Sequence, residues 1–120
     1  MIIKSKAKTF TAVALGASLL AAGPAAEAAK APKKSVKIGD NFFSPKKATV
    51  KPGTVVTWKW LADNADSHDV KLKKGPKGVK KFTSEIAATD YSYKKKLSKK
   101  GKYSLYCTLH EDMSQTITVK

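Results

Sequence analysis

Four side chains that can bind a soft metal ion dominate the chemistry of this sequence. Cys107, His110 and Met113 lie within one short segment near the C-terminus, and His68 lies upstream. Apart from the initiator methionine, the chain has no further cysteine, histidine or methionine. A thiolate, two imidazoles and a weaker thioether are the ligands of a mononuclear blue-copper electron-transfer site. The residue types therefore predict one copper ion bound by these four residues.

The ligand spacing, Cys107-x-x-His110-x-x-Met113, resembles the loop of the cupredoxins of the plastocyanin and amicyanin type. Segments elsewhere in residues 35–120 follow the order of that family, among them Asn-Phe-Phe-Ser-Pro at 41–45. The resemblance implies a type 1 copper site in which His68 is buried and the ring edge of His110 is partly exposed as the electron port. It also implies that the backbone N–H of Asp69 donates to the Cys107 sulfur.

The elements that must position these ligands have the pattern of short β-strands. Apolar and polar side chains alternate from Thr54 to Trp60, which is typical of a half-buried strand. A loop of turn residues then leads to His68 and to a second alternating run over 69–73. Seven to eight such strands, separated by Gly, Pro, Asn and Lys turns and with almost no helical periodicity, predict an all-β fold. We expect an antiparallel Greek-key β-sandwich with the tryptophans and the Phe42-Phe43 pair in its core.

The N-terminal residues have the composition of an export signal. Three lysines within the first eight residues precede an apolar run over 9–23 and a small-residue tract that ends at Ala28. This order is typical of a secretory signal peptide, and the run is shorter than the ~20 residues that span a bilayer. An uncleaved anchor is the alternative. We predict a signal peptide over 1–28, a flexible basic linker over 29–35 and a copper-binding domain over 36–120, exported to the periplasm or the extracellular envelope.

Export affects how Cys107 is interpreted, because a lone thiol in an oxidising compartment has no intramolecular partner. Such a thiol is an inert core residue, pairs with another chain, or binds a metal ion. Each of His68, His110 and Met113 has an equally ordinary explanation as a loop or core residue. Their combination and spacing favour the copper site over four independent coincidences.

The charge is strongly positive. The chain has 24 basic residues, all of them lysine, against 9 acidic residues, for a net charge of +15. Lysine lacks the planar fork with which arginine binds phosphate groups, so we expect no specific nucleic-acid binding. A positive field of this size speeds encounter with acidic partners at low salt. An acidic redox partner protein is the expectation, and electrostatic attachment to an anionic envelope or membrane surface is the alternative.

Together these features predict a monomeric, exported one-electron carrier that is not an enzyme. Copper storage or delivery with the same ligands is the alternative function. Two histidines cannot supply both this site and a further copper cluster, which argues against a multicopper oxidase. A hydrolase built on Cys107 and His110 would need a third, orienting group that the sequence does not indicate.

Overall fold

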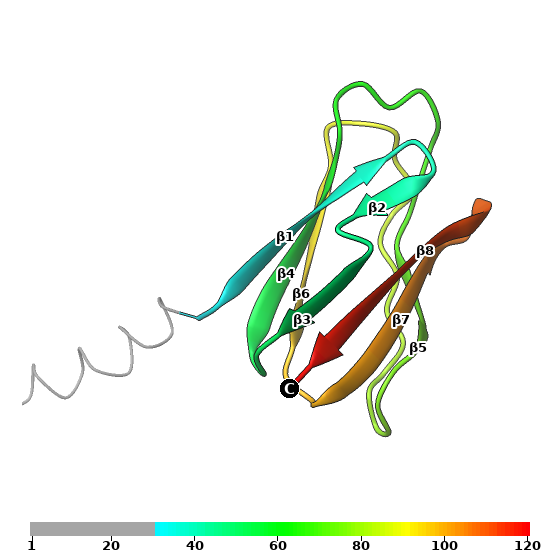
Figure 1. The fold of residues 1–120 in the computed structure, drawn as a ribbon. Coiled ribbons are helices and arrows are strands. Elements are labelled where there is room, and N and C mark those ends of the chain that lie inside the picture. The colour runs from blue at the N-terminus through cyan, green and yellow to red at the C-terminus, as the bar shows by residue number, and fades with distance from the viewer. Residues whose placement is uncertain (1–30) are drawn as a thin grey trace, which may run out of the picture. The chain divides into compact units, whose positions relative to one another are not determined.

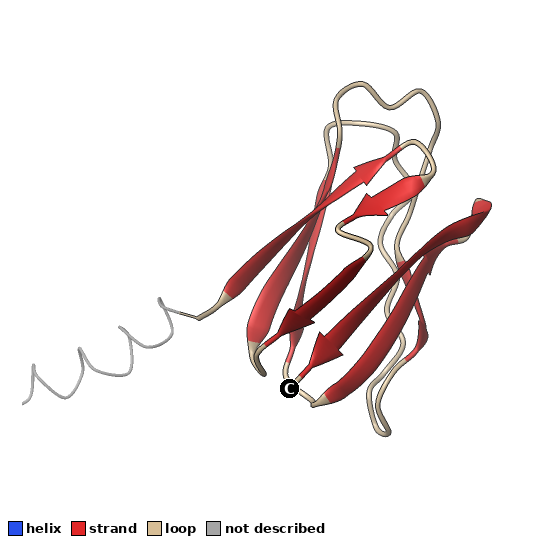
Figure 2. Ribbon diagram, viewed as in Figure 1, coloured by secondary structure: helices blue, strands red, loops and turns tan. Residues whose placement is uncertain are grey.

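The computed structural model describes residues 31–120, which form two four-stranded β-sheets packed face to face (Figures 1 and 2). The strands are β1 (Lys33–Gly39), β2 (Phe42–Ser44), β3 (Lys47–Val50), β4 (Thr54–Trp60), β5 (Lys71–Lys74), β6 (Ser92–Leu97), β7 (Gly101–Cys107) and β8 (His110–Val119). The predicted all-β sandwich is confirmed. Among the described residues, no helix has the length and apolar character needed to cross a membrane. The predicted signal peptide lies outside the described residues.

The chain alternates between the two sheets. One sheet has the order β2-β1-β4-β6 and the other β3-β8-β7-β5. Most neighbouring strands are antiparallel, but β1 pairs with β4 and β3 pairs with β8 in parallel. The predicted antiparallel sandwich therefore also contains two parallel strand pairs. Because β3 joins the second sheet, the chain returns to the first sheet in the direction of β1, and β4 can pair with it in parallel.

The first strand begins earlier than the sequence suggested. Residues 33–35, which were expected to be part of the flexible linker, pair with residues 55–57 of β4. The backbone N–H of Val55 also donates to the carbonyl of Pro32 at 2.9 Å. Two lysines and a serine occupy 33–35, so no apolar pattern marks them as a strand. Their backbone pairing, rather than their side chains, places them in the sheet.

The core lies between the sheets and includes both tryptophans. Trp58 is fully buried, and its Nε1 donates to Oε1 of the buried Gln115 at 2.9 Å. The Gln115 amide nitrogen donates in turn to the carbonyl of Pro45 at 2.7 Å. The hydrogen bond between Trp58 of β4 and Gln115 of β8 thus links the two sheets, and the polar groups of Gln115 are satisfied. The predicted Phe42-Phe43 core pair is half correct. Strand alternation buries Phe43 and leaves Phe42 45% exposed.

Candidate metal centre

Three of the four predicted ligands meet at one end of the sandwich. One potential ligand atom each of His68, Cys107 and His110 lies within 4.8 Å of the others. Cys107 ends β7 and His110 begins β8, so the tight connection between these strands brings them together. His68 lies between β4 and β5, where its backbone N–H and C=O both bond to Ala87. This bridge fixes His68 against the segment between β5 and β6.

Met113 lies on the inner side of β8, three residues after His110. Its side chain is 1% exposed and belongs to the main apolar core. With His110, Leu109 and Asn41, it also lines an open hollow of about 500 Å³ beside the site. Met113 thus shares this hollow with His110, and its assignment as the axial ligand stays a prediction.

The environment of the His68 ring fits a metal ion. The ring is fully buried, and Nε2 lies 2.8 Å from Oδ1 of Asp40. The Asp40 carboxylate can only accept a hydrogen bond, so Nε2–H donates to it and the ring's lone pair is on Nδ1. Nδ1 is buried and has no hydrogen-bond partner, a costly state for a polar atom. A metal ion bound between Nδ1, the Cys107 sulfur and the His110 ring would satisfy it.

Asp40 orients His68 from a distant part of the chain. It lies in the turn between β1 and β2 and accepts hydrogen bonds from the backbone N–H groups of Ala65 at 2.9 Å and Asp66 at 3.1 Å. The Ala65 N–H, then the His68 ring and the Asp66 N–H, lower the pKa of the Asp40 carboxyl to about 2. The carboxylate therefore stays charged and fixes both the loop before His68 and the tautomer of its ring.

The Cys107 thiol is buried, and its sulfur lies 3.5 Å from Nδ1 of His110. Burial raises the pKa of this thiol above its ordinary value, and the Asp69 carboxylate raises it further. The backbone N–H groups of Asp69 and Leu109 act in the opposite direction, because they favour the thiolate. This supports the donor role that the family resemblance implied for Asp69. Without a metal ion the sulfur is a neutral thiol, so metal binding must displace its proton.

The side chain of Asp69 connects the His68 segment to the ligand loop. It is 4% exposed, and its two oxygens accept from the Thr108 backbone N–H at 2.7 Å and the Thr108 hydroxyl at 2.6 Å. Hydrogen bonds to an ionised carboxylate are shorter and stronger than neutral ones. This clamp fixes the residue that follows Cys107, and so holds the two halves of the site in register.

His110 reaches the surface, as the resemblance implied. Its side chain is 26% exposed, whereas that of His68 is fully buried. The two rings lie 4.8 Å apart between centroids, and Nε2 of His110 lies 4.0 Å from a carboxylate oxygen of Asp66. The neighbouring Leu109 is 48% exposed and gives the rim an apolar contact.

The sequence did not identify three carboxylates as parts of the site: those of Asp40, Asp66 and Asp69. Asp66 and Asp69 are close to His68 in the sequence, and this proximity was the one available signal. The contacts of their carboxylates with His110 and Thr108 are not indicated by the sequence. Asp40 precedes His68 by 28 residues, so only the folded chain brings it to that ligand.

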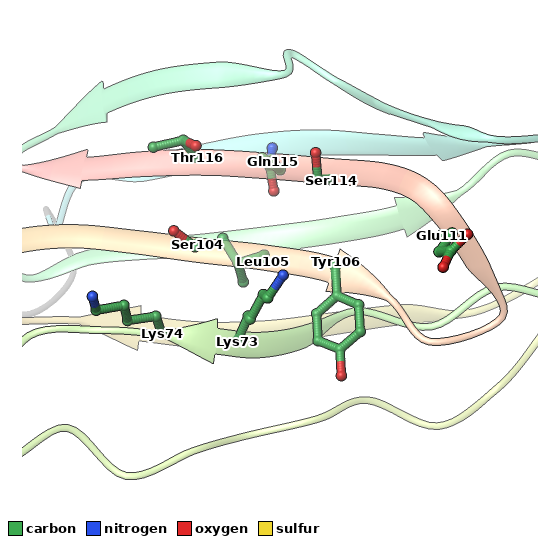
Figure 3. Close-up of a pocket in the computed structure, with 9 residues that line it drawn as sticks. All are labelled: Lys73, Lys74, Ser104, Leu105, Tyr106, Glu111, Ser114, Gln115 and Thr116. Carbon is green, nitrogen blue, oxygen red and sulfur yellow. The ribbon is translucent and has the colours of Figure 1, made fainter.

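A second hollow, of about 590 Å³, lies away from the ligand atoms (Figure 3). It opens on the outer face of the β3-β8-β7-β5 sheet, where Ser104, Tyr106, Ser114 and Thr116 alternate with inward-facing core residues. Glu111 lines its far end, close to the β7–β8 turn. This hollow is on the opposite side of the sheet from the inward-facing Cys107 and Met113.

Comparisons with known proteins agree with this geometry. Residues 30–120 match the family of copper binding proteins described as the plastocyanin/azurin family. The chain is 31% identical over 103 residues to amicyanin-alpha of Methylorubrum extorquens AM1, which covers 84% of this chain and 85% of that protein.

Solved structures show the same fold. A variant of amicyanin in its oxidised form superposes with a TM-score of 0.64 at 24% identity, over 73% of this chain and 82% of that chain. A copper-containing nitrite reductase from Thermus scotoductus superposes with a TM-score of 0.62 at 23% identity, over 73% of this chain and 22% of that chain. The ligand cluster, the fold and the sequence match agree: this chain belongs to the plastocyanin/azurin family of copper-binding proteins, the cupredoxins.

Proposed function

We propose that the protein is a one-electron carrier that binds a single type 1 copper ion through His68, Cys107, His110 and Met113. The observation that carries this proposal is the buried, unpartnered Nδ1 of His68 within reach of the Cys107 sulfur and the His110 ring. A copper ion bound there would supply one-electron exchange between its two oxidation states. The assignment of Met113 rests on its burial, on the hollow that it shares with His110 and on the spacing of the loop.

The protein's part is to hold the ligand atoms in one arrangement. Asp40 fixes the His68 ring, and Asp69 fixes Thr108 directly after Cys107. Both contacts are hydrogen bonds to a carboxylate. In each case the carboxylate comes from a different segment of the chain than the ligand that it helps to position. A site whose ligands are locked by such contacts needs little rearrangement when the charge of its ion changes. This rigidity suits electron transfer.

The exposed edge of His110 is the proposed electron port. It opens on the hollow lined by Asn41, Leu109 and Asp112, where a redox partner can approach within contact distance. Cys107, by contrast, is 1% exposed and its thiol pKa is raised by burial, which is unsuited to a nucleophile that must reach a substrate. We therefore propose a carrier rather than an enzyme, acting as a monomer.

We also propose that the protein is exported, from the predicted signal peptide over 1–28, and that a redox protein is its partner. The charge of that partner stays a prediction. Apart from Glu27, every Asp and Glu of the chain lies in residues 40–41, 61–70, 83–91 or 108–113, at the site end, and these segments contain no lysine. The surface around His110 is therefore poor in positive charge, which does not favour an acidic partner at the proposed electron port.

Copper storage or delivery uses the same ligands and is separated from electron transfer by kinetics. The copper-loaded protein should give a reversible one-electron wave in voltammetry and fast electron self-exchange by NMR line broadening. It should also keep its copper when challenged with a chelator on the same timescale. Rapid loss of copper to the chelator together with slow self-exchange would assign the protein to delivery.

A further inference from the structure

The outer surface of the β2-β1-β4-β6 sheet carries a group of lysines on three adjacent strands. Strand alternation turns Val36 and Ile38 of β1, and Val56 and Trp58 of β4, into the core. The residues between them point outward and lie side by side through the strand register. We call the five exposed lysines of this surface the lysine face: Lys33, Lys37, Lys59, Lys94 and Lys96.

The register concentrates the charge of the lysine face. Lys37 is the direct cross-strand partner of Lys59. Lys33 and Lys96 both flank Val55, one from each neighbouring strand. The other outward positions of these strands and of β2 are uncharged: Ser35, Gly39, Phe42, Ser44, Val55, Thr57 and Ser92. Like charges directly opposite one another destabilise a sheet, and a bound anionic surface would relieve that repulsion.

An exposed aromatic ring shares this surface. Phe42 pairs with Gly39 at the edge of the sheet and points to the same side as Lys37. Its ring lies directly over the Gly39 backbone, where a side chain would collide with it, and the residue is 45% exposed. An apolar ring among lysines is the composition with which peripheral proteins engage anionic lipid: the ring enters the acyl boundary and the lysines meet the headgroups.

We propose that the lysine face binds the surface of an anionic lipid bilayer. Charge complementarity carries the proposal, together with the position of Phe42 at its edge. An acidic protein fits less well, because specific protein interfaces are anchored by clustered aromatic residues and arginine in packed pockets. The lysine face has one aromatic ring, no arginine and only solvated point charges.

Binding in this way would leave the metal centre free. His110 is the first residue of β8, which belongs to the other sheet, and β8 begins at one end of the sandwich (Figure 1). The protein could therefore stay on a membrane surface while a partner contacts the His110 edge. The bilayer proposal does not depend on copper, and it can be tested with the metal-free protein.

The test measures co-sedimentation of the metal-free full chain with sucrose-loaded vesicles of phosphatidylcholine containing one quarter phosphatidylglycerol. The test variant is Lys37→Gln/Lys59→Gln/Lys94→Gln. Each lysine near an anionic surface strengthens binding about fivefold, so the triple substitution should lower the partition coefficient about a hundredfold at low salt. Phe42→Ser should weaken the binding that persists at high salt, where lysine contributions are screened.

The matched control removes the same charge from the other sheet. Lys47→Gln/Lys73→Gln/Lys102→Gln changes three exposed lysines of the β3-β8-β7-β5 sheet and should lower partitioning less than about tenfold. Both triple variants keep residues 1–32, so any contribution of the leader is the same in each. Circular dichroism checks that each variant is folded.

Three results would overturn the proposal. Equal losses in the two triple variants would mean that overall charge, and not this face, attracts the vesicles. Absence of binding to the anionic vesicles by the unsubstituted chain would exclude the bilayer. Binding of polyglutamate that depends on Lys37, Lys59 and Lys94, without vesicle binding, would assign the face to an acidic protein instead.

Discussion

The carboxylate of Asp69 gives the sharpest test of how the metal centre is held together. It receives two short hydrogen bonds from Thr108, and its charge adds to burial in raising the pKa of the Cys107 thiol. We therefore expect Asp69→Ala to lower stability. We expect Asp69→Asn to separate the hydrogen bonding to Thr108 from the effect of the charge on the Cys107 pKa. Asparagine preserves the shape of the side chain and removes only its charge.

The magnitudes follow from the contacts. A hydrogen bond to a charged group contributes about 1.5–3 kcal/mol, and Asp69→Ala removes two of them. Thr108 is exposed, so water replaces part of the loss, and we expect a decrease of about 2–4 kcal/mol in the free energy of unfolding. Asparagine can still accept from the Thr108 N–H and can donate to its hydroxyl, which accepts as well as donates. Asp69→Asn should therefore cost less than about 1.5 kcal/mol.

Two assays on the metal-free protein measure these effects. Urea unfolding gives the stability, and the pH dependence of the Cys107 Cβ chemical shift in NMR gives the thiol pKa. We expect Asp69→Asn to move this titration midpoint to lower pH, because a negative charge beside the sulfur has been removed. If asparagine destabilised the protein as much as alanine, or moved the midpoint upward, the proposed clamp and its charge effect would both be wrong.

Three further predictions concern other parts of the account. Met113→Gln should retain copper with a shifted reduction potential, since glutamine is a known axial ligand in such sites, and loss of copper would contradict the axial role. The pKa of Asp40 is lowered from 3.8 to about 2, so its charge stabilises the fold above about pH 4 and that contribution is lost as the pH falls toward 2. In urea unfolding, the stability difference between the unsubstituted protein and Asp40→Asn should shrink across that window, and a constant difference would exclude the charge of the Asp40 carboxylate as its source. Trp58→Phe leaves Gln115 Oε1 buried without its donor and should cost about 2–4 kcal/mol, whereas a cost below about 1 kcal/mol would show that another group replaces it.

The sequence was sufficient for the features that are repeated along the chain. Alternation from Thr54 to Trp60 identified β4 with its observed bounds, because a half-buried strand displays its period directly in its side chains. The candidate copper ligands could be proposed because Cys107, His110 and Met113 are close in sequence and their residue types are scarce elsewhere. In both cases the information is local.

Features that depend on contacts between distant segments could not be predicted. Residues 33–35 lie in a strand because β4 pairs with them, although their side chains look like those of a linker. The Asp40–His68 hydrogen bond depends on the β1–β2 turn meeting the loop after β4. Phe42 looked like a core residue beside Phe43. Only the pairing of β2 with β1 decides which of the two side chains points into the core and which faces solvent.

The most direct test of the copper site is the visible spectrum of the purified protein after addition of one equivalent of Cu(II), with Cys107→Ser as the control. The proposed ligand set predicts an intense blue or green charge-transfer band from the Cys107 thiolate, and its loss in the serine variant. A colourless complex with the unsubstituted protein, or a band that persists in Cys107→Ser, would contradict the assignment of this cluster as a type 1 copper site.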